Sequence, residues 1–81
     1  MHQLILKILT LVMVVSEKTK HDAFFNFYGH CNNITVSVYE NGFNATIKPK
    51  VFDIYFEALS TKKALSKLNE IKDYLESLLE D

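Results

Sequence analysis

The sequence predicts a small α+β domain: an antiparallel sheet of three or four strands, with an N-terminal and a C-terminal helix packed on one face. Two runs near the middle of the 81-residue chain, 23–29 and 33–40, alternate apolar with polar or aromatic residues and are separated by a Gly- and Asn-containing turn. Further along, apolar residues recur at spacings of four and three, which is the period of an amphipathic helix. A chain of this length makes one domain, residues 1–81.

Residues 3–16 are expected to form the first helix. Their helical stripe consists of Leu4, Ile8, Leu11 and Val15. The other sides of this segment are apolar as well, so a helix here must be covered on nearly all sides. Its β-branched residues also suit a strand, but its length and the absence of a turn signal favour a helix. Residues 16–22 are expected to form a polar connection.

The middle of the chain is expected to form a meander of short strands. Strands at 23–29 and 33–40 flank a turn at 29–33, and a third strand covers 51–57. Asn41-Gly42 is a turn dipeptide, which allows an additional short strand at 43–47. The alternation assigns the following side chains to the buried face: Phe25, Phe27, Ile34, Val36, Val38, Phe52, Ile54 and Phe56.

The last helix is the clearest element in the sequence. Ser60 or Thr61 is expected to cap its first turn, because a hydroxyl there accepts from amides that lack an intrahelical partner. The apolar stripe of this helix consists of Ala64, Leu68, Ile71, Leu75 and Leu78. Residues 51–81 carry seven acidic residues against four lysines, which suits contact with a basic partner, although an ordinary solvated helix face explains these charges better.

Composition limits the classes of function. Apolar residues make up 48% of the chain, more than one small core can bury, which predicts a self-association or partner surface. The chain has no arginine, which argues against specific recognition of nucleic acid. One cysteine excludes an internal disulfide, and a reduced cytoplasmic location is expected. The N-terminal apolar run and two glycosylation sequons, at Asn33 and Asn44, would instead suit secretion, but Lys7 interrupts that run and no cleavage site follows it.

Residues with catalytic or ligand-binding potential are few. His30-Cys31 combines a thiol with an imidazole, but neighbours in a strand or turn seldom align as nucleophile and base, so no catalytic residue is assigned. The spacing of His, Cys and acidic residues does not match a metal motif, and no cofactor is expected. His30, Lys48 and Lys50 are candidate ligand residues. The two lysines suit an anion, although scattered solubilising lysines explain them better, and His30 would line a ligand pocket between protomers.

The strongest functional prediction concerns the other face of the sheet. Large aromatic residues there resemble the core of a protein interface, although pairing of aromatic residues across strands explains them about equally well. This interaction face is predicted to comprise Phe24, Tyr28, Thr35, Ser37, Tyr39, Asp53, Tyr55 and Glu57. The expected function is non-enzymatic binding, to a second copy of the chain or to a host protein. The alternative is a protein that sequesters a small ligand or nucleotide in a pocket between protomers.

The order of elements and one motif resemble a known group of proteins. The motif runs FFNFYGHCNNITVSVYENG from Phe24, and VFDIYF and a Lys/Glu/Leu-rich helix follow it. In these features the chain resembles small uncharacterised proteins of phages and prophages of Gram-positive bacteria. The resemblance implies an accessory protein that acts inside the host cell, and it brings no catalytic residue with it. The N-terminal segment is more apolar than the amphipathic helix expected of that group.

Overall fold

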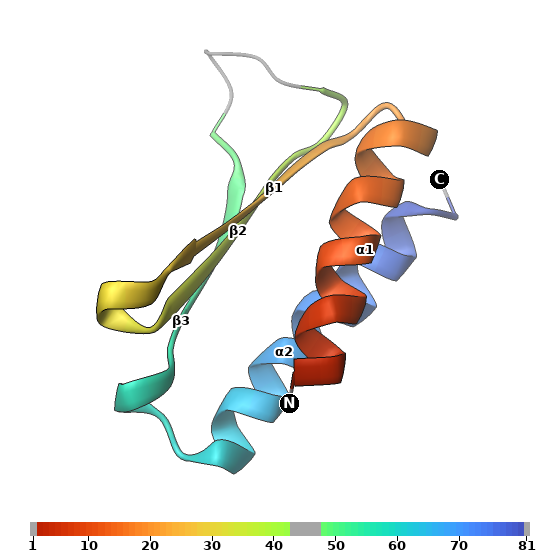
Figure 1. Ribbon diagram of the computed structural model, residues 1–81. Helices are drawn as coiled ribbons and strands as arrows, with labels where there is room; N and C mark the ends of the chain where they lie inside the picture. Colours follow the sequence, from red (N-terminus) through yellow and green to blue (C-terminus); the bar gives the residue numbers. More distant parts are fainter. Residues whose placement is uncertain (1, 43–47, 81) are drawn as a thin grey trace.

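The computed structural model describes residues 2–42 and 48–80 and has two layers, a sheet and a pair of helices (Figure 1). Along the chain the elements are α1 (His2–Lys18), β1 (Asp22–Tyr28), β2 (Asn33–Tyr39), β3 (Lys50–Tyr55) and α2 (Thr61–Leu78). Short 3₁₀ turns lie at η1 (Gly29–Cys31) and η2 (Phe56–Ala58). Both helices lie on the same side of the sheet, so the predicted α+β fold is confirmed.

The sheet is antiparallel, and among the described residues it has three strands in the order β1-β2-β3. Its register sets Phe25 opposite Val36 and Val36 opposite Phe52, so these side chains share the face toward the helices. Val36 is fully buried there, and Phe25 and Phe52 are partly buried. The core consists mainly of Ile8, Leu11, Val12, Val15, Ala23, Ile34, Val36, Val38, Ile54, Leu68, Ile71, Leu75 and Leu78.

Helix α2 agrees with its predicted pattern. All five residues of its predicted apolar stripe are buried. Ser60 is the N-cap, and its hydroxyl oxygen accepts a hydrogen bond from the backbone N–H of Lys63 at 3.2 Å. The cap fixes the start of α2, while the stripe determines which side of the helix faces the sheet.

Helix α1 differs from its prediction in how it is covered. It extends from His2 to Lys18, longer than expected at both ends, and its buried side is limited to Ile8, Leu11, Val12 and Val15. The expectation that nearly all sides would be covered was wrong, because within residues 2–42 and 48–80 the sheet and α2 are the layers that pack against α1. Leu6, Leu9 and Met13 are exposed to solvent on another side of the helix.

The strands also differ from their predictions at their ends. Phe27 belongs to the inner face by alternation, yet it is 58% exposed. The reason is that the hairpin end of the sheet diverges from the helices, as Figure 1 shows. Strand β3 ends at Tyr55, so Phe56 and Glu57 lie in η2 and not in a strand. Asn41 and Gly42 both have positive φ, as expected of the turn dipeptide, and the possible strand at 43–47 lies outside the described residues.

Side-chain hydrogen bonds hold the connection between α1 and β1. The Ser16 hydroxyl donates to the carbonyl of Ala23 at 3.1 Å and accepts from its N–H at 3.0 Å. His21 is buried, and its Nδ1 accepts from the backbone N–H of Asn41 at 3.0 Å. In the described sheet β1 is an edge strand, so the outward-facing N–H and C=O of Ala23 have no neighbouring strand to bond with. The Ser16 hydroxyl bonds to both groups instead.

Replacing Ser16 with alanine is expected to lower the free energy of unfolding by about 1–3 kcal/mol, since two backbone groups of the buried Ala23 lose their partner. Urea denaturation measures the change. Thr10→Ala is the matched control, because the Thr10 hydroxyl bonds only to the exposed carbonyl of Leu6 in its own helix. Equal losses in the two variants would contradict a special role for Ser16.

Candidate binding surfaces

The outer face, defined as the side of the sheet away from α1 and α2, is uncovered in the described chain (Figure 1). Strand pairing arranges its side chains in rows across the three strands. From the hairpin end these rows are Tyr28–Asn33–Tyr55, Asn26–Thr35–Asp53 and Phe24–Ser37–Val51, followed by Asp22–Tyr39. Seven of the eight residues predicted for the interaction face therefore share this surface.

Glu57 is the exception among the predicted residues. The prediction extended β3 to residue 57, but the strand ends at Tyr55 and Glu57 is exposed in η2. Once the chain leaves the extended conformation, alternation no longer determines the direction of a side chain. Val51, by contrast, lies on the outer face and was not predicted, although alternation continued back from Asp53 and Tyr55 would have found it.

Polar contacts order the middle of the outer face. The Thr35 hydroxyl donates to Oδ1 of Asp53 at 2.7 Å. Asn33 is buried although it belongs to the outer rows, and its Nδ2 donates to the carbonyl of Ile54 at 3.0 Å. Since that amide nitrogen is bound inside the protein, the sequon at Asn33 is blocked in the folded chain.

The aromatic residues of the outer face are partly paired. Phe24 and Tyr39 meet edge to face, with ring centroids 5.7 Å apart, as the cross-strand explanation predicts. Pairing nevertheless leaves much of this surface in contact with solvent. Phe24, Tyr28, Val51 and Tyr55 are each between 44% and 51% exposed. The outer face thus presents exposed aromatic groups around a hydrogen-bonded polar row.

The candidate ligand residues are not brought together within one chain. His30 lies in η1 at the hairpin end, with its ring 6.5 Å from that of Tyr28. Lys50 pairs with Val38 near the other end of β2, about 17 Å from the hairpin end at 3.4 Å per residue. Its ammonium group lies over the rings of Phe52 and Tyr74, and Lys48 is exposed nearby in the chain.

His30 and Cys31 each have a recorded contact with Tyr28. The Cys31 thiol points to the carbonyl of Tyr28, with its sulfur 3.8 Å from that oxygen. The His30 ring lies edge-on to the ring of Tyr28. In residues 2–42 and 48–80 no three His, Cys, Asp or Glu side chains gather as metal ligands.

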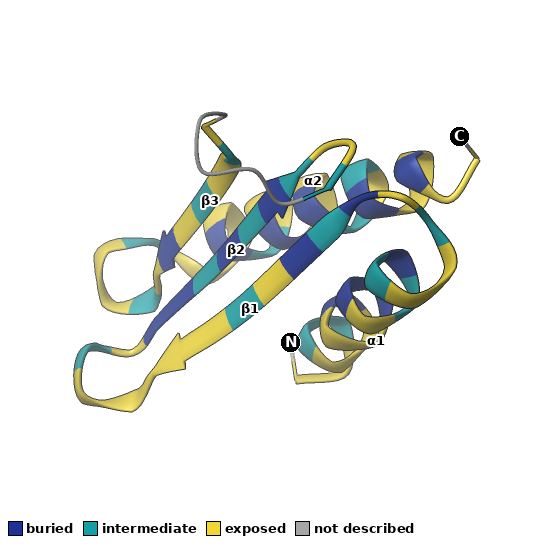
Figure 2. Cartoon of the chain, turned by 90° about the horizontal axis from the view of Figure 1, so that it is seen from above, coloured by how far each residue is buried: buried dark blue, intermediate teal, exposed yellow. Residues whose placement is uncertain are grey.

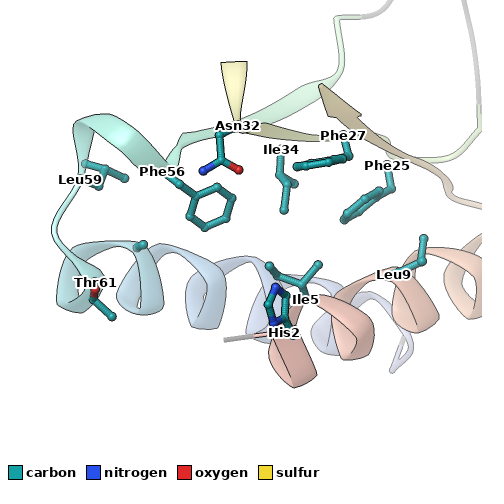
Figure 3. A pocket seen from close by; sticks show the side chains of 11 residues that line it. His2, Ile5, Leu9, Phe25, Phe27, Asn32, Ile34, Phe56, Leu59 and Thr61 are labelled. Carbon is teal, nitrogen blue, oxygen red and sulfur yellow. The ribbon is translucent and has the colours of Figure 1, made fainter. Parts of the chain in front are cut away.

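A groove between the helices and the hairpin end of the sheet is the feature that the sequence did not predict. It has a volume of about 520 Å³ and is mainly apolar. Figure 3 shows Phe25, Phe27 and Ile34 on the sheet side, facing Ile5 and His2 of α1. Leu9, Asn32, Phe56, Leu59, Thr61 and Ala64 complete the lining. Alternation placed Phe25 and Phe27 on the correct side of the sheet. The space itself arises because the sheet and the helices diverge at this end.

The acidic surface of α2 is partly neutralised. Lys72 lies 3.6 Å from a carboxylate oxygen of Asp73 and 3.6 Å from one of Glu76. Lys62, Lys63 and Lys67 are exposed in the first half of the same helix. The carboxylates of α2 are therefore a weaker basis for recognition than the outer face.

No family model, curated protein or solved structure matches this chain. In the part of the chain that the structure describes, neither helix is long and apolar enough to cross a bilayer.

Proposed function

We propose that this chain is a non-enzymatic binding protein that holds a partner protein against its outer face. The observation that supports the proposal most directly is the uncovered sheet with exposed Phe24, Tyr28, Val51 and Tyr55. Aromatic side chains bring large contact area with few rotatable bonds, and tyrosine adds a hydroxyl, so such residues dominate binding energy in protein interfaces.

The sheet holds this surface in place before any partner arrives. Hydrogen bonds fix Thr35 to Asp53, and the Phe24 ring rests against Tyr39. A preformed surface loses little conformational entropy on binding, so more of the contact energy contributes to affinity. The mechanism that follows is steric: while a partner is bound to the outer face, this chain covers part of the partner's surface and keeps other ligands from binding there.

The resemblance to phage and prophage proteins suggests where such a partner is found. On that resemblance, the proposed partner is a host protein in the cytoplasm of a Gram-positive bacterium. Binding and occlusion of such a partner require no catalytic residue.

To test the proposal, the chain is expressed in a Gram-positive host with a photo-crosslinking amino acid placed on its outer face. With the probe at Phe24 or Tyr55, we expect the same host protein to be attached, because both positions lie on one surface. A probe at Ser66, which is exposed on α2 opposite its buried stripe, is the matched control and should not attach that protein. Mass spectrometry identifies the adducts. An adduct that forms equally at all three positions, or none at Phe24 and Tyr55, would refute the proposal.

The identified protein then allows a measurement of affinity. Replacing Tyr55 with alanine should raise its Kd at least tenfold, which corresponds to about 1.4 kcal/mol. Ser66→Ala should leave the Kd unchanged, because Ser66 lies on the far side of α2. Circular dichroism verifies that both variants are folded, which is expected because both side chains are exposed.

A further inference from the structure

We propose that the chain forms a symmetric dimer through an apolar ridge on α1, in which the second copy presents the same ridge. The ridge is defined as Leu6, Leu9 and Met13. It lies away from the outer face, so this proposal goes beyond the function proposed above and does not depend on it. Leu6 is 61% exposed and Met13 55%, which are high values for apolar side chains in a helix that also contributes four residues to the core.

The spacing of the ridge indicates a second helix-packing seam. Its residues follow one another at intervals of three and four, the period of side chains that meet a partner helix. At 100° per residue, the centre of the ridge lies about 140° around α1 from the centre of the buried side formed by Ile8, Leu11, Val12 and Val15. The fold uses one of these two apolar sides of α1, and no part of the described chain covers the other.

The ridge is continuous with the rim of the groove. Leu9 belongs to both, and Phe27 lies on the sheet side of the same groove. The exposed parts of Leu6, Met13 and Phe27 amount to roughly 100 Å² each, and Leu9 adds to them. A standard interface buries about 800 Å² per partner, somewhat more than half of it apolar. The ridge and Phe27 together therefore supply most of the apolar area that a small dimer needs.

Charge favours an antiparallel arrangement of two α1 helices. When Leu6 of one copy lies opposite Met13 of the other, Glu17 of each copy comes beside His2 and the first turn of the opposite helix. Helix N-termini carry a partial positive charge, so the Glu17 carboxylate is stabilised there. A parallel pair would instead bring like ends together. The antiparallel contact is also isologous, as the two-fold symmetry of a dimer requires.

The mass of the protein in solution tests this inference. At about 500 μM we expect sedimentation equilibrium to give twice the 9.4 kDa of the single chain. The double variant Leu6→Glu, Met13→Glu should sediment as a monomer, because the ridge then carries two buried charges per copy. Val51→Glu, at a residue of similar exposure on the outer face, is the matched control and should remain dimeric.

Two results would overturn the inference: a monomeric natural chain at that concentration, or a dimer that survives the double variant. A dimer lost only with Val51→Glu would assign the contact to the outer face instead. Far-UV circular dichroism establishes that the double variant is folded, and Leu6→Ser, a milder change, replaces it if it is not. As a second readout, the Tm of the natural chain should rise by a few degrees between about 10 and 500 μM, while that of the variant should not change.

Discussion

Replacing Leu75 with alanine is expected to lower the free energy of unfolding by about 2–5 kcal/mol, which leaves little of the stability of a domain this small. Leu75 is completely buried in the stripe of α2 that faces the sheet and α1. Its loss removes apolar contacts and leaves a cavity that a two-layer core cannot close without moving a whole helix. Urea denaturation followed by circular dichroism measures the effect, and the Tm should fall by roughly 10–20 °C.

Leu79→Ala provides the matched control for this prediction. Leu79 has the same side chain and lies one turn further along, but it is 37% exposed at the end of the helix. Its replacement should cost about half as much as that of Leu75 or less, because more than a third of this side chain already lies in water. Equal losses at the two positions would mean that α2 packs differently against the sheet.

The Asn33→Asp variant is expected to lose about 3–5 kcal/mol at pH 7, although the two side chains have nearly the same shape. Asn33 is 3% exposed, and its Nδ2 donates to the carbonyl oxygens of Ile54 at 3.0 Å and Ile34 at 3.4 Å. A carboxylate cannot donate there. It would place a buried negative charge against two carbonyl oxygens, and both interactions would become repulsive.

The loss in this variant should depend on pH. Burial beside carbonyl oxygens raises the pKa of the new carboxyl in the folded state above its unfolded value of about 3.9. Below that unfolded value both states bind the proton, and the charge contributes no penalty. As the pH rises, the unfolded state loses its proton first, so the penalty grows until the folded pKa is passed.

Urea denaturation at about pH 4 and at pH 7 should therefore give a smaller difference from the natural chain at the lower pH. Asn26→Asp is the control, since Asn26 is exposed on the same face and its carboxyl would remain solvated. A loss at Asn33 that does not change with pH would show that the new side chain escapes to solvent.

The sequence predicted elements whose apolar pattern is simple. In α2 the stripe from Ala64 to Leu78 specifies one buried side, and every residue of it is buried. In β2 the alternation of Ile34, Val36 and Val38 identified the inner face correctly. These patterns follow from the local repeat of each element, which is 3.6 residues per turn in a helix and two residues in a strand. The buried side can therefore be predicted without knowledge of the neighbouring elements.

Predictions failed where burial depends on the shape of the whole molecule. Phe27 follows the strand pattern correctly, yet it is exposed because the sheet and the helices diverge at the hairpin end. In helix α1 the predicted stripe does face the core, with Ile8, Leu11 and Val15 buried, but periodicity did not show that the side with Leu6 and Met13 stays uncovered in the described structure. Figure 2 shows the effect of this divergence of sheet and helices along β1, which is buried near its start and exposed at the hairpin end. The angle between two layers is a property of packing and leaves no periodic signal in the sequence.

Most of the candidate interaction face could be predicted, because membership of a sheet face follows from alternation alone. Glu57 was the error, since η2 ends the strand early. The groove could not be predicted, because it depends on Ile5 of α1 and Phe56 of η2 lying across a gap, and these residues are about fifty positions apart.

The hydrogen bonds of Ser16 to Ala23 have a consequence for aggregation. An edge strand with free N–H and C=O groups is a template on which further chains can add. Outward-facing groups alternate along β1, so those next to Ala23 belong to Phe25 and Phe27. With Ala23 occupied by Ser16, an incoming strand finds only that shorter part of the β1 edge. We therefore expect the Ser16 hydroxyl to weaken strand addition at this aromatic-rich edge, and a Ser16→Ala chain to aggregate faster than the natural chain.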